Sequence, residues 1–298
     1  MKKRDFLSIN DINKAEFWQI LRLAKKLKTG TFKGLTLQGR TLGMIFEKSS
    51  TRTRVSFEVG MTQLGGHAIF LSPNDTQIGR GESIADTART LSRYVDVIMY
   101  RAFKNENMNE LARWATVPVI NALDDVEHPC QILADLMTVW EHYGKLKGLK
   151  LAYVGDCENN VTHSLALGCK LTGMEFVAAG PKGYHLASSI QRLAPRAKQI
   201  TDPKEAVRRA DVVVTDTWVS MGDETEKAER LKIFKPYQVN QKLMSLAKKK
   251  AVFLHCLPAY RGNEVAAEVI DGPQSLVWDE AENRLHTQKA LMVWLLGK

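Results

Sequence analysis

The sequence predicts an α/β fold of two domains, each built on a mostly parallel sheet flanked by helices. Short apolar or β-branched runs alternate with amphipathic stretches along the whole chain, which is typical of βαβ units. The strand candidates form two sets of four, separated by a long helical stretch. The first set is 41–46, 67–71, 96–100 and 118–123, and the second set is 149–155, 175–180, 211–216 and 251–257.

The stretch between the two sets predicts where the domains divide. Apolar residues recur at helical spacing over 131–143, and a run rich in glycine and lysine follows over 143–150. We therefore expect a helix that joins the domains, a first domain over 1–143 and a second domain over 144–281.

Helices are also predicted at both ends of the chain. The segment 282–298 has strong helix formers and apolar residues at helical spacing, so it needs a surface to pack on. The sequence alone does not say which domain supplies that surface. Near the N-terminus, an amphipathic helix over 17–28 is expected to be capped by Asn10 or Asp11.

The composition is that of an ordinary globular protein, with 298 residues of which 44% are hydrophobic and 25% charged. No run of about 18 apolar residues occurs, and the N-terminus lacks the apolar stretch and cleavage site of a secretory signal. We therefore expect a cytoplasmic protein. The four cysteines form no CxxC pair and no grouping with histidine, which favours free thiols over a disulfide framework or a metal site.

The formal net charge of +9 is compatible with a nucleic-acid binder or with an enzyme that attracts small anions. The densest basic run, Lys248–Lys250, precedes a strand candidate and is explained as a solvated helix end. No arginine-rich tail or interleaved aromatic stripe occurs. The charge distribution therefore favours an enzyme, with no nucleic-acid or membrane partner.

A cluster of hydroxyl groups and arginines lies where the first strand candidate ends and a helix begins. The run contains Ser50, Thr51, Arg52 and Thr53, beside the free backbone N–H groups and the positive dipole end of that helix. This combination predicts an anion site. The alternative is a hydroxyl N-cap with solvated arginines, which the cluster alone does not exclude.

Two further strand ends supply polar groups. Arg101 ends the third strand candidate, and His128 with Pro129 follows the fourth at a strand-to-helix turn. Each alone could be an ordinary surface or structural residue. Ligands of open parallel sheets gather outside the carboxyl ends of the strands. The convergence of Arg52, Arg101 and His128 therefore predicts a pocket whose natural ligand is phosphate.

The second set of strands predicts a different kind of site. The run after the strand over 149–155 lacks G-x-G-x-x-G, so no nicotinamide or flavin cofactor is expected. Asp216, Ser220 and Met221 offer a carboxylate for an ammonium group, and a hydroxyl and backbone for a carboxylate; the alternative is a solvated loop. Cys256 could be a nucleophile, a weak thiol partner of a substrate or a core residue. No neighbouring base in the motif supports the nucleophile.

Taken in order, S-T-R-T-R, H-P-C-Q, D-x-x-x-S-M-G and H-C-L-P resemble the motifs of the aspartate/ornithine carbamoyltransferase family, and the resemblance spans most of the chain. The first two motifs belong to the wider family and suggest carbamoyl phosphate, whereas the last two point to its ornithine members. The resemblance implies domains joined by interdomain helices, a terminal helix 282–298 that returns to the first domain, and a homotrimer.

The resemblance also implies roles for the residues that match the motifs. It implies that carbamoyl phosphate is bound by Ser50, Thr51, Arg52, Thr53, Gln77, Arg101, His128, Pro129, Cys130, Gln131, Cys256, Leu257 and Arg284. It implies that ornithine is bound by Asn160, Asp216, Ser220 and Met221, and that Arg52, Arg101, His128 and Cys256 take part in catalysis. Gln77 is expected to act from a neighbouring subunit, and no metal takes part.

The implied reaction is attack of the side-chain amine of L-ornithine on the carbonyl carbon of carbamoyl phosphate, giving L-citrulline and phosphate in arginine biosynthesis. Two alternatives remain open. A carbamoyltransferase for aspartate, an acylated ornithine or putrescine would use the same motifs in the first domain. A phosphate-sensing or nucleic-acid-binding protein would use the cluster of hydroxyl groups and arginines, but would have no reason for the polar strand ends of the second domain.

Overall fold

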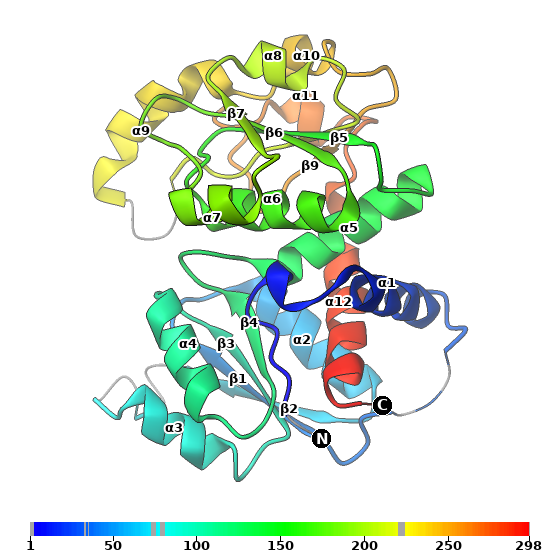
Figure 1. Ribbon diagram of the computed structural model, residues 1–298, viewed down its shortest axis with the longest axis vertical. Coiled ribbons are helices and arrows are strands. Elements are labelled where there is room, and N and C mark those ends of the chain that lie inside the picture. The colour runs from blue at the N-terminus through cyan, green and yellow to red at the C-terminus, as the bar shows by residue number, and fades with distance from the viewer. Residues whose placement is uncertain are drawn as a thin grey trace. The chain divides into compact units, whose positions relative to one another are not determined.

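The computed structural model describes residues 3–32, 34, 36–72, 76–77, 81–219 and 224–297. In it, the chain divides into two compact units, which are Met1–Ala134 with Glu282–Lys298, and Asp135–Ala281. Each unit contains a parallel sheet flanked by helices (Figure 1). The predicted α/β fold class is therefore confirmed.

The sheet of the first unit has the strand order β2-β1-β3-β4 over the described residues, and all neighbouring strands are parallel. Its strands are β1 (Thr41–Phe46), β2 (His67–Leu71), β3 (Val97–Arg101) and β4 (Val119–Leu123). All of β3 is buried, as expected for a parallel strand that is covered on both faces. Because the strand order reverses between β1 and β3, the carboxyl ends of these two strands form the topological switch point of the sheet, where open α/β sheets bind ligands.

The first unit begins with a 3-10 turn and then a helix, and the N-cap of that helix is not the predicted residue. Helix α1 (Lys14–Lys28) starts after Asn13, whose side chain accepts hydrogen bonds from the backbone N–H groups of Ala15 and Glu16. The prediction of Asn10 or Asp11 as the cap is therefore wrong. Asp11 instead belongs to the turn η1 (Ile9–Asp11). Asn10, Asp11 and Asn13 lie close together in the sequence and all have side chains that can cap a helix, so the sequence does not distinguish between them.

Helices pack on both faces of this sheet (Figure 1). They are α2 (Thr51–Gln63), α3 (Ile84–Leu91), α4 (Asn105–Trp114), the first turns of α5 (Pro129–Tyr143) and most of α12 (Val277–Leu295). On one face, a buried core cluster joins Ala88 of α3 and Leu111 of α4 to Ile98 and Tyr100 of β3. On the other face, α2 contacts α12. This second contact brings a segment from the end of the chain to the switch point between β1 and β3.

The second unit has a sheet of strand order β7-β6-β5-β8-β9 over its described residues, again with parallel neighbours. Its strands are β5 (Lys150–Val154), β6 (Glu175–Ala179), β7 (Lys198–Ile200), β8 (Val212–Val214) and β9 (Val252–Leu254). The predicted count of four is wrong, because β7 was missed. Its three residues, Lys-Gln-Ile, lie at the sheet edge and carry one apolar side chain, too little for a hydrophobic pattern.

The strand order of the second sheet reverses between β5 and β8, so its switch point lies at the ends of those strands. The flanking helices are the rest of α5, α6 (Asn160–Thr172), α7 (Ser188–Leu193), α8 (Pro203–Val207), α9 (Lys227–Phe234), α10 (Gln241–Met244) and α11 (Ala267–Ile270). Short 3-10 turns, Glu224–Glu226 and Lys235–Tyr237, flank α9. No helix in the described part of the chain is long and apolar enough to cross a membrane.

Candidate functional site

The run Ser50–Thr53 forms the N-terminus of α2, directly after the end of β1. Ser50 is the N-cap, and its Oγ accepts a hydrogen bond from the backbone N–H of Thr53 at 3.2 Å. Thr51 is exposed, Arg52 is partly buried and Thr53 is buried. The predicted N-cap and the predicted cluster at a helix N-terminus are therefore both present, and the two interpretations of this run do not exclude each other.

Arg284 of α12 lies at this helix N-terminus, buried at 3% exposure. Its guanidinium donates to Thr53 Oγ1 at 3.2 Å, to Gln131 Oε1 at 2.6 Å and to Gln288 Oε1 at 3.0 Å. Gln288 also accepts a hydrogen bond from Ser56 Oγ at 3.1 Å. Because Arg284 is held by residues of α2, α5 and α12, its position is fixed by three helices that meet at the switch point.

Arg101 and His128 complete a buried cluster in the first unit. Arg101 ends β3 opposite Phe46 of β1, and His128 lies at the turn before α5. Burial, and then the positive charges of Arg284, Arg101, Lys48 and Arg52, lower the pKa of His128 well below its usual range. His128 is therefore a neutral imidazole beside several permanent cations, which is the electrostatic environment of an anion site.

Asp124 fixes the turn that carries His128. Its Oδ1 accepts hydrogen bonds from the backbone N–H groups of Val126 at 2.8 Å and Glu127 at 2.7 Å, and its Oδ2 accepts from the side-chain amides of Asn121 and Asn105. Asp124 is fully buried, so these four donors replace its hydration. The turn is thus held by a residue to which the sequence interpretation gave no role.

Lys48 also belongs to this cluster and was missed. It is the residue immediately before the two serines that lead into α2, and its Nζ lies 5.1 Å from the ring centroid of Phe103. Burial and then the charge of Arg101 lower its pKa. A lysine at the start of the hydroxyl and arginine run was the available signal, but sequence spacing does not show that its side chain lies near Arg101.

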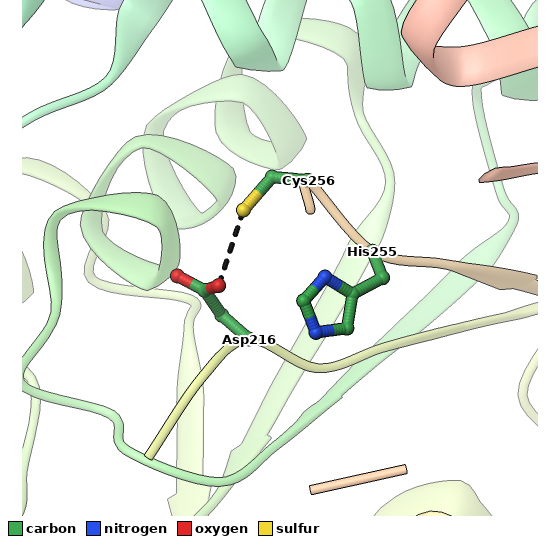
Figure 2. A group of neighbouring side chains, drawn as sticks. All are labelled: Asp216, His255 and Cys256. Carbon is green, nitrogen blue, oxygen red and sulfur yellow. Dashed lines mark hydrogen bonds between the residues drawn. The ribbon is translucent and has the colours of Figure 1, made fainter. Parts of the chain in front are cut away.

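The second unit brings together Asp216, His255 and Cys256 (Figure 2). The Cys256 thiol donates to Asp216 Oδ1 at 3.1 Å. His255 Nδ1 accepts from the backbone N–H of Leu257 at 2.9 Å, and its Nε2 lies 3.3 Å from Glu264 Oε1. One ligand atom from each of the three residues lies within 4.8 Å of the others, but both nitrogens of His255 already have protein partners. Asp216 and Cys256 thus form a hydrogen-bonded pair, and the hydrogen bonds of His255 go to other residues.

Burial affects the protonation of Asp216 and Cys256. It raises the pKa of Cys256 well above the usual thiol range, and the neighbouring Asp216 carboxylate acts in the same direction. It also raises the pKa of Asp216. Cys256 is therefore a thiol that donates a hydrogen bond, rather than a thiolate nucleophile.

Asn160 is the first residue of α6, after the turn that follows β5. Its neighbour Asn159 caps that helix through Thr162 and donates to Asp216 Oδ2 at 3.4 Å and to the Tyr153 hydroxyl at 2.8 Å. The turn after β5 and the end of β8 therefore meet at the switch point of the second sheet. Ser220 and Met221, predicted for this site, lie outside the described residues.

The remaining residues predicted to bind carbamoyl phosphate lie in both units. Pro129 is the first residue of α5, Cys130 is buried with its thiol 3.4 Å from the Asn121 carbonyl, and Gln77 is exposed. Leu257 follows Cys256 in the second unit and is partly buried. The predicted carbamoyl-phosphate residues thus divide between the units, with Cys256 and Leu257 in the second and the others in the first.

Comparison with known proteins identifies the class of this chain. Residues 4–141 match the model of the aspartate/ornithine carbamoyltransferase carbamoyl-P binding domain, and residues 147–295 match that of the Asp/Orn binding domain. An ornithine carbamoyltransferase from Carboxydothermus hydrogenoformans is 56% identical over 99% of this chain and 98% of its own length. The chain is thus a transferase of the carbamoyltransferase class.

Solved structures agree with this class. Ornithine carbamoyltransferase from Pyrococcus furiosus is 50% identical, with a TM-score of 0.95 over 99% of this chain and 97% of its own. An N-acetyl-L-ornithine transcarbamylase is 32% identical, with a TM-score of 0.88 over 98% and 99% of the two chains. The chain belongs to the aspartate/ornithine carbamoyltransferase family, which confirms the resemblance found in its motifs.

The lowered pKa of His128 predicts a loss of stability in acid. As the pH falls below about 6.5, the unfolded imidazole binds a proton that the folded one does not, so unfolding is favoured by up to about 1.4 kcal/mol per pH unit. The substitution His128→Gln should remove this part of the pH dependence. Urea unfolding between pH 7.5 and 5.5, in buffers without phosphate, measures it. Equal pH dependence in wild type and variant would contradict the neutral buried imidazole.

Proposed function

We propose that this enzyme transfers the carbamoyl group of carbamoyl phosphate to the side-chain amine of L-ornithine, giving L-citrulline and phosphate in arginine biosynthesis. The observation that carries the proposal is the buried cluster of Arg101, His128 and Arg284 at the N-terminus of α2. Permanent cations and free helix N–H groups favour a dianionic phosphate over other ligands. The names of the similar proteins support ornithine as the acceptor.

In the proposed complex, the first unit holds carbamoyl phosphate. Arg52 and the N–H groups of α2 would bind the phosphate, while Arg101, His128 and Thr53 would face the carbonyl oxygen. Arg284 would complete the binding site. Its hydrogen bonds to Thr53, Gln131 and Gln288 would hold its guanidinium in position. The further residues proposed for this ligand are Ser50, Thr51, Pro129, Cys130, Gln131, Cys256, Leu257 and, from a neighbouring subunit, Gln77.

Direct transfer requires no covalent enzyme intermediate. The nitrogen lone pair of the neutral amine forms the new bond to the carbonyl carbon, and the bond from that carbon to the phosphate oxygen breaks with its electrons leaving on phosphate. The attacking nitrogen loses one proton and the departing phosphate gains one, so the products are citrulline and hydrogen phosphate. Negative charge develops on the carbonyl oxygen in the transition state, after the new bond begins to form and before the bond to phosphate breaks. A fixed donor at that oxygen stabilises the transition state by about 3 kcal/mol. Arg101 and His128 are the residues proposed for this role.

The second unit would bind the amine substrate. An alkyl ammonium has a pKa of about 10.4, so the attacking amine must lose a proton before it reacts. Asp216 and the Cys256 thiol are proposed to orient that amine, since the two already share a hydrogen bond. Asn160, Ser220 and Met221 are proposed to bind the rest of ornithine.

The proposed reaction assigns one substrate to each domain. We propose residues 1–143 with 282–298 as the carbamoyl-phosphate-binding domain and 144–281 as the ornithine-binding domain. A homotrimer is proposed as the assembly, supported by the exposed apolar residues Val55 and Val59 on α2 and Ile69 on the edge strand β2. The cytoplasmic location stays a prediction.

The choice of amine is tested by offering the purified enzyme ornithine, aspartate, N-acetylornithine and putrescine with carbamoyl phosphate. A colorimetric assay for ureido products should show ornithine preferred by about a hundredfold in kcat/KM. A site that binds the α-ammonium and carboxylate of ornithine rejects putrescine, which lacks the carboxylate, and N-acetylornithine, whose α-amino group is blocked. Aspartate has no side-chain amine to react. Product from aspartate alone, or a preference for the acetylated amine, would overturn the proposed acceptor. Salt-dependent retention of DNA without turnover would favour the nucleic-acid alternative.

The phosphate-binding role is tested by Arg52→Gly. Turnover should fall by about 10²- to 10³-fold and the KM for carbamoyl phosphate should rise, because a charged donor to the phosphate is lost. The control is Arg22→Gly, an exposed arginine in the middle of α1, which reports the cost of a glycine in a helix. Near-wild-type activity of a folded Arg52→Gly protein would be incompatible with the proposed role.

A further inference from the structure

Arg230 of α9 connects the two loops that meet at the switch point of the second sheet. It is buried, at 6% exposure, and it lies outside the four sequence motifs. Its guanidinium lies over the rings of Tyr184 and Phe234, with Cζ 5.1 Å and 5.3 Å from their centroids. An arginine enclosed in this way is held in one orientation, so its donors have fixed directions.

The first partner of Arg230 is the backbone after Asp216. Nε of Arg230 donates to the carbonyl of Trp218 at 2.6 Å. The segment 216–219 is itself closed by local hydrogen bonds, with the Thr217 N–H donating to Asp216 Oδ1 at 2.7 Å and the Thr217 hydroxyl to the Val219 carbonyl at 3.1 Å. Arg230 therefore fixes a compact segment that carries Asp216.

The second partner is Asp156, in the turn after β5. The two form an ion pair in which each side chain is 8% exposed. Asp156 also accepts from the backbone N–H of Glu158 at 2.9 Å, and its carbonyl accepts from the Thr162 hydroxyl at 3.1 Å. Since Thr162 lies in the first turn of α6, this network fixes the turn that presents Asn159 and Asn160.

We propose that Arg230 is a positioning residue for the amine subsite. It sets the position of the 216–219 segment relative to the turn after β5, and so the position of Asp216 relative to Asn160. The inference rests on the proposed function, because that function assigns ornithine to these two residues. Arg230 acts through Trp218 and Asp156 and does not itself touch the substrate. Lysine cannot replace it, because one ammonium does not reproduce two donors in a fixed plane.

A purely stabilising ion pair is the competing explanation, and a double variant separates the two. Removing one member of a buried pair leaves an unpaired charge and destabilises the fold, whereas removing both relieves that cost. If Arg230 acts only through the pair, Arg230→Met with Asp156→Asn should restore both stability and kinetics. If it acts by positioning, the double variant should regain stability but keep its kinetic defect, since the Trp218 carbonyl still lacks its donor.

The experiment compares Arg230→Met, Arg230→Lys and the double variant with wild type in steady-state kinetics. We expect the KM for ornithine to rise by about tenfold to a hundredfold in each, because small displacements of a binding group have large effects, while the KM for carbamoyl phosphate stays within about twofold. Arg261→Gln is the control, since it removes an exposed pair with Asp271 in the same unit. If Arg230→Met does not fold, the other two variants give the same comparison.

A double variant with the wild-type KM for ornithine would overturn the proposal, as would an unchanged KM in Arg230→Lys. Amide hydrogen exchange of the 216–219 peptide, measured without substrate, keeps the test independent of the amine. We expect that exchange to be about tenfold faster in the double variant than in wild type, and equal exchange would overturn positioning. Lack of ornithine turnover by wild type would instead contradict the proposed function alone.

Discussion

The structure of the first unit depends on one electrostatic constraint, which is the concentration of positive charge around a buried neutral imidazole. Arg52, Arg101, Arg284 and Lys48 all act on His128 in the same direction. Cations kept together in a poorly solvated place repel one another unless an anion balances them. A dianionic ligand therefore relieves a cost that the folded chain carries, and the free N–H groups of α2 add to the same attraction.

Hydrogen bonds within the protein hold the residues of this cluster in position. Arg284 is tied to Thr53, Gln131 and Gln288, and Asp124 closes the turn before α5. The second unit follows the opposite electrostatic logic. There a buried carboxyl and a protonated thiol form an acceptor and donor pair suited to an amine. The two sites thus differ in charge as their proposed substrates do, with cations for an anion and a carboxyl for an amine.

The two parallel sheets and the polar residues at their strand ends could be predicted from the sequence. Parallel strands present their carboxyl ends at one edge of the sheet, so the sequence predicts that Arg52, Arg101 and His128 gather there. Contacts between distant segments could not be predicted by spacing. Arg284 donates to Gln131 across 153 positions, and Arg230 reaches Asp156 across 74. Strand β7 was missed because an edge strand of three residues carries almost no pattern.

The central claim is that the first unit contains an anion site that binds carbamoyl phosphate. Calorimetric titration of the wild-type enzyme with a non-hydrolysable methylene phosphonate analogue of carbamoyl phosphate tests it most directly. The analogue should bind without ornithine, and its affinity should fall as the salt concentration rises, because the attraction is mainly electrostatic. An analogue that fails to bind, or that binds with an affinity independent of the salt concentration, would contradict the account.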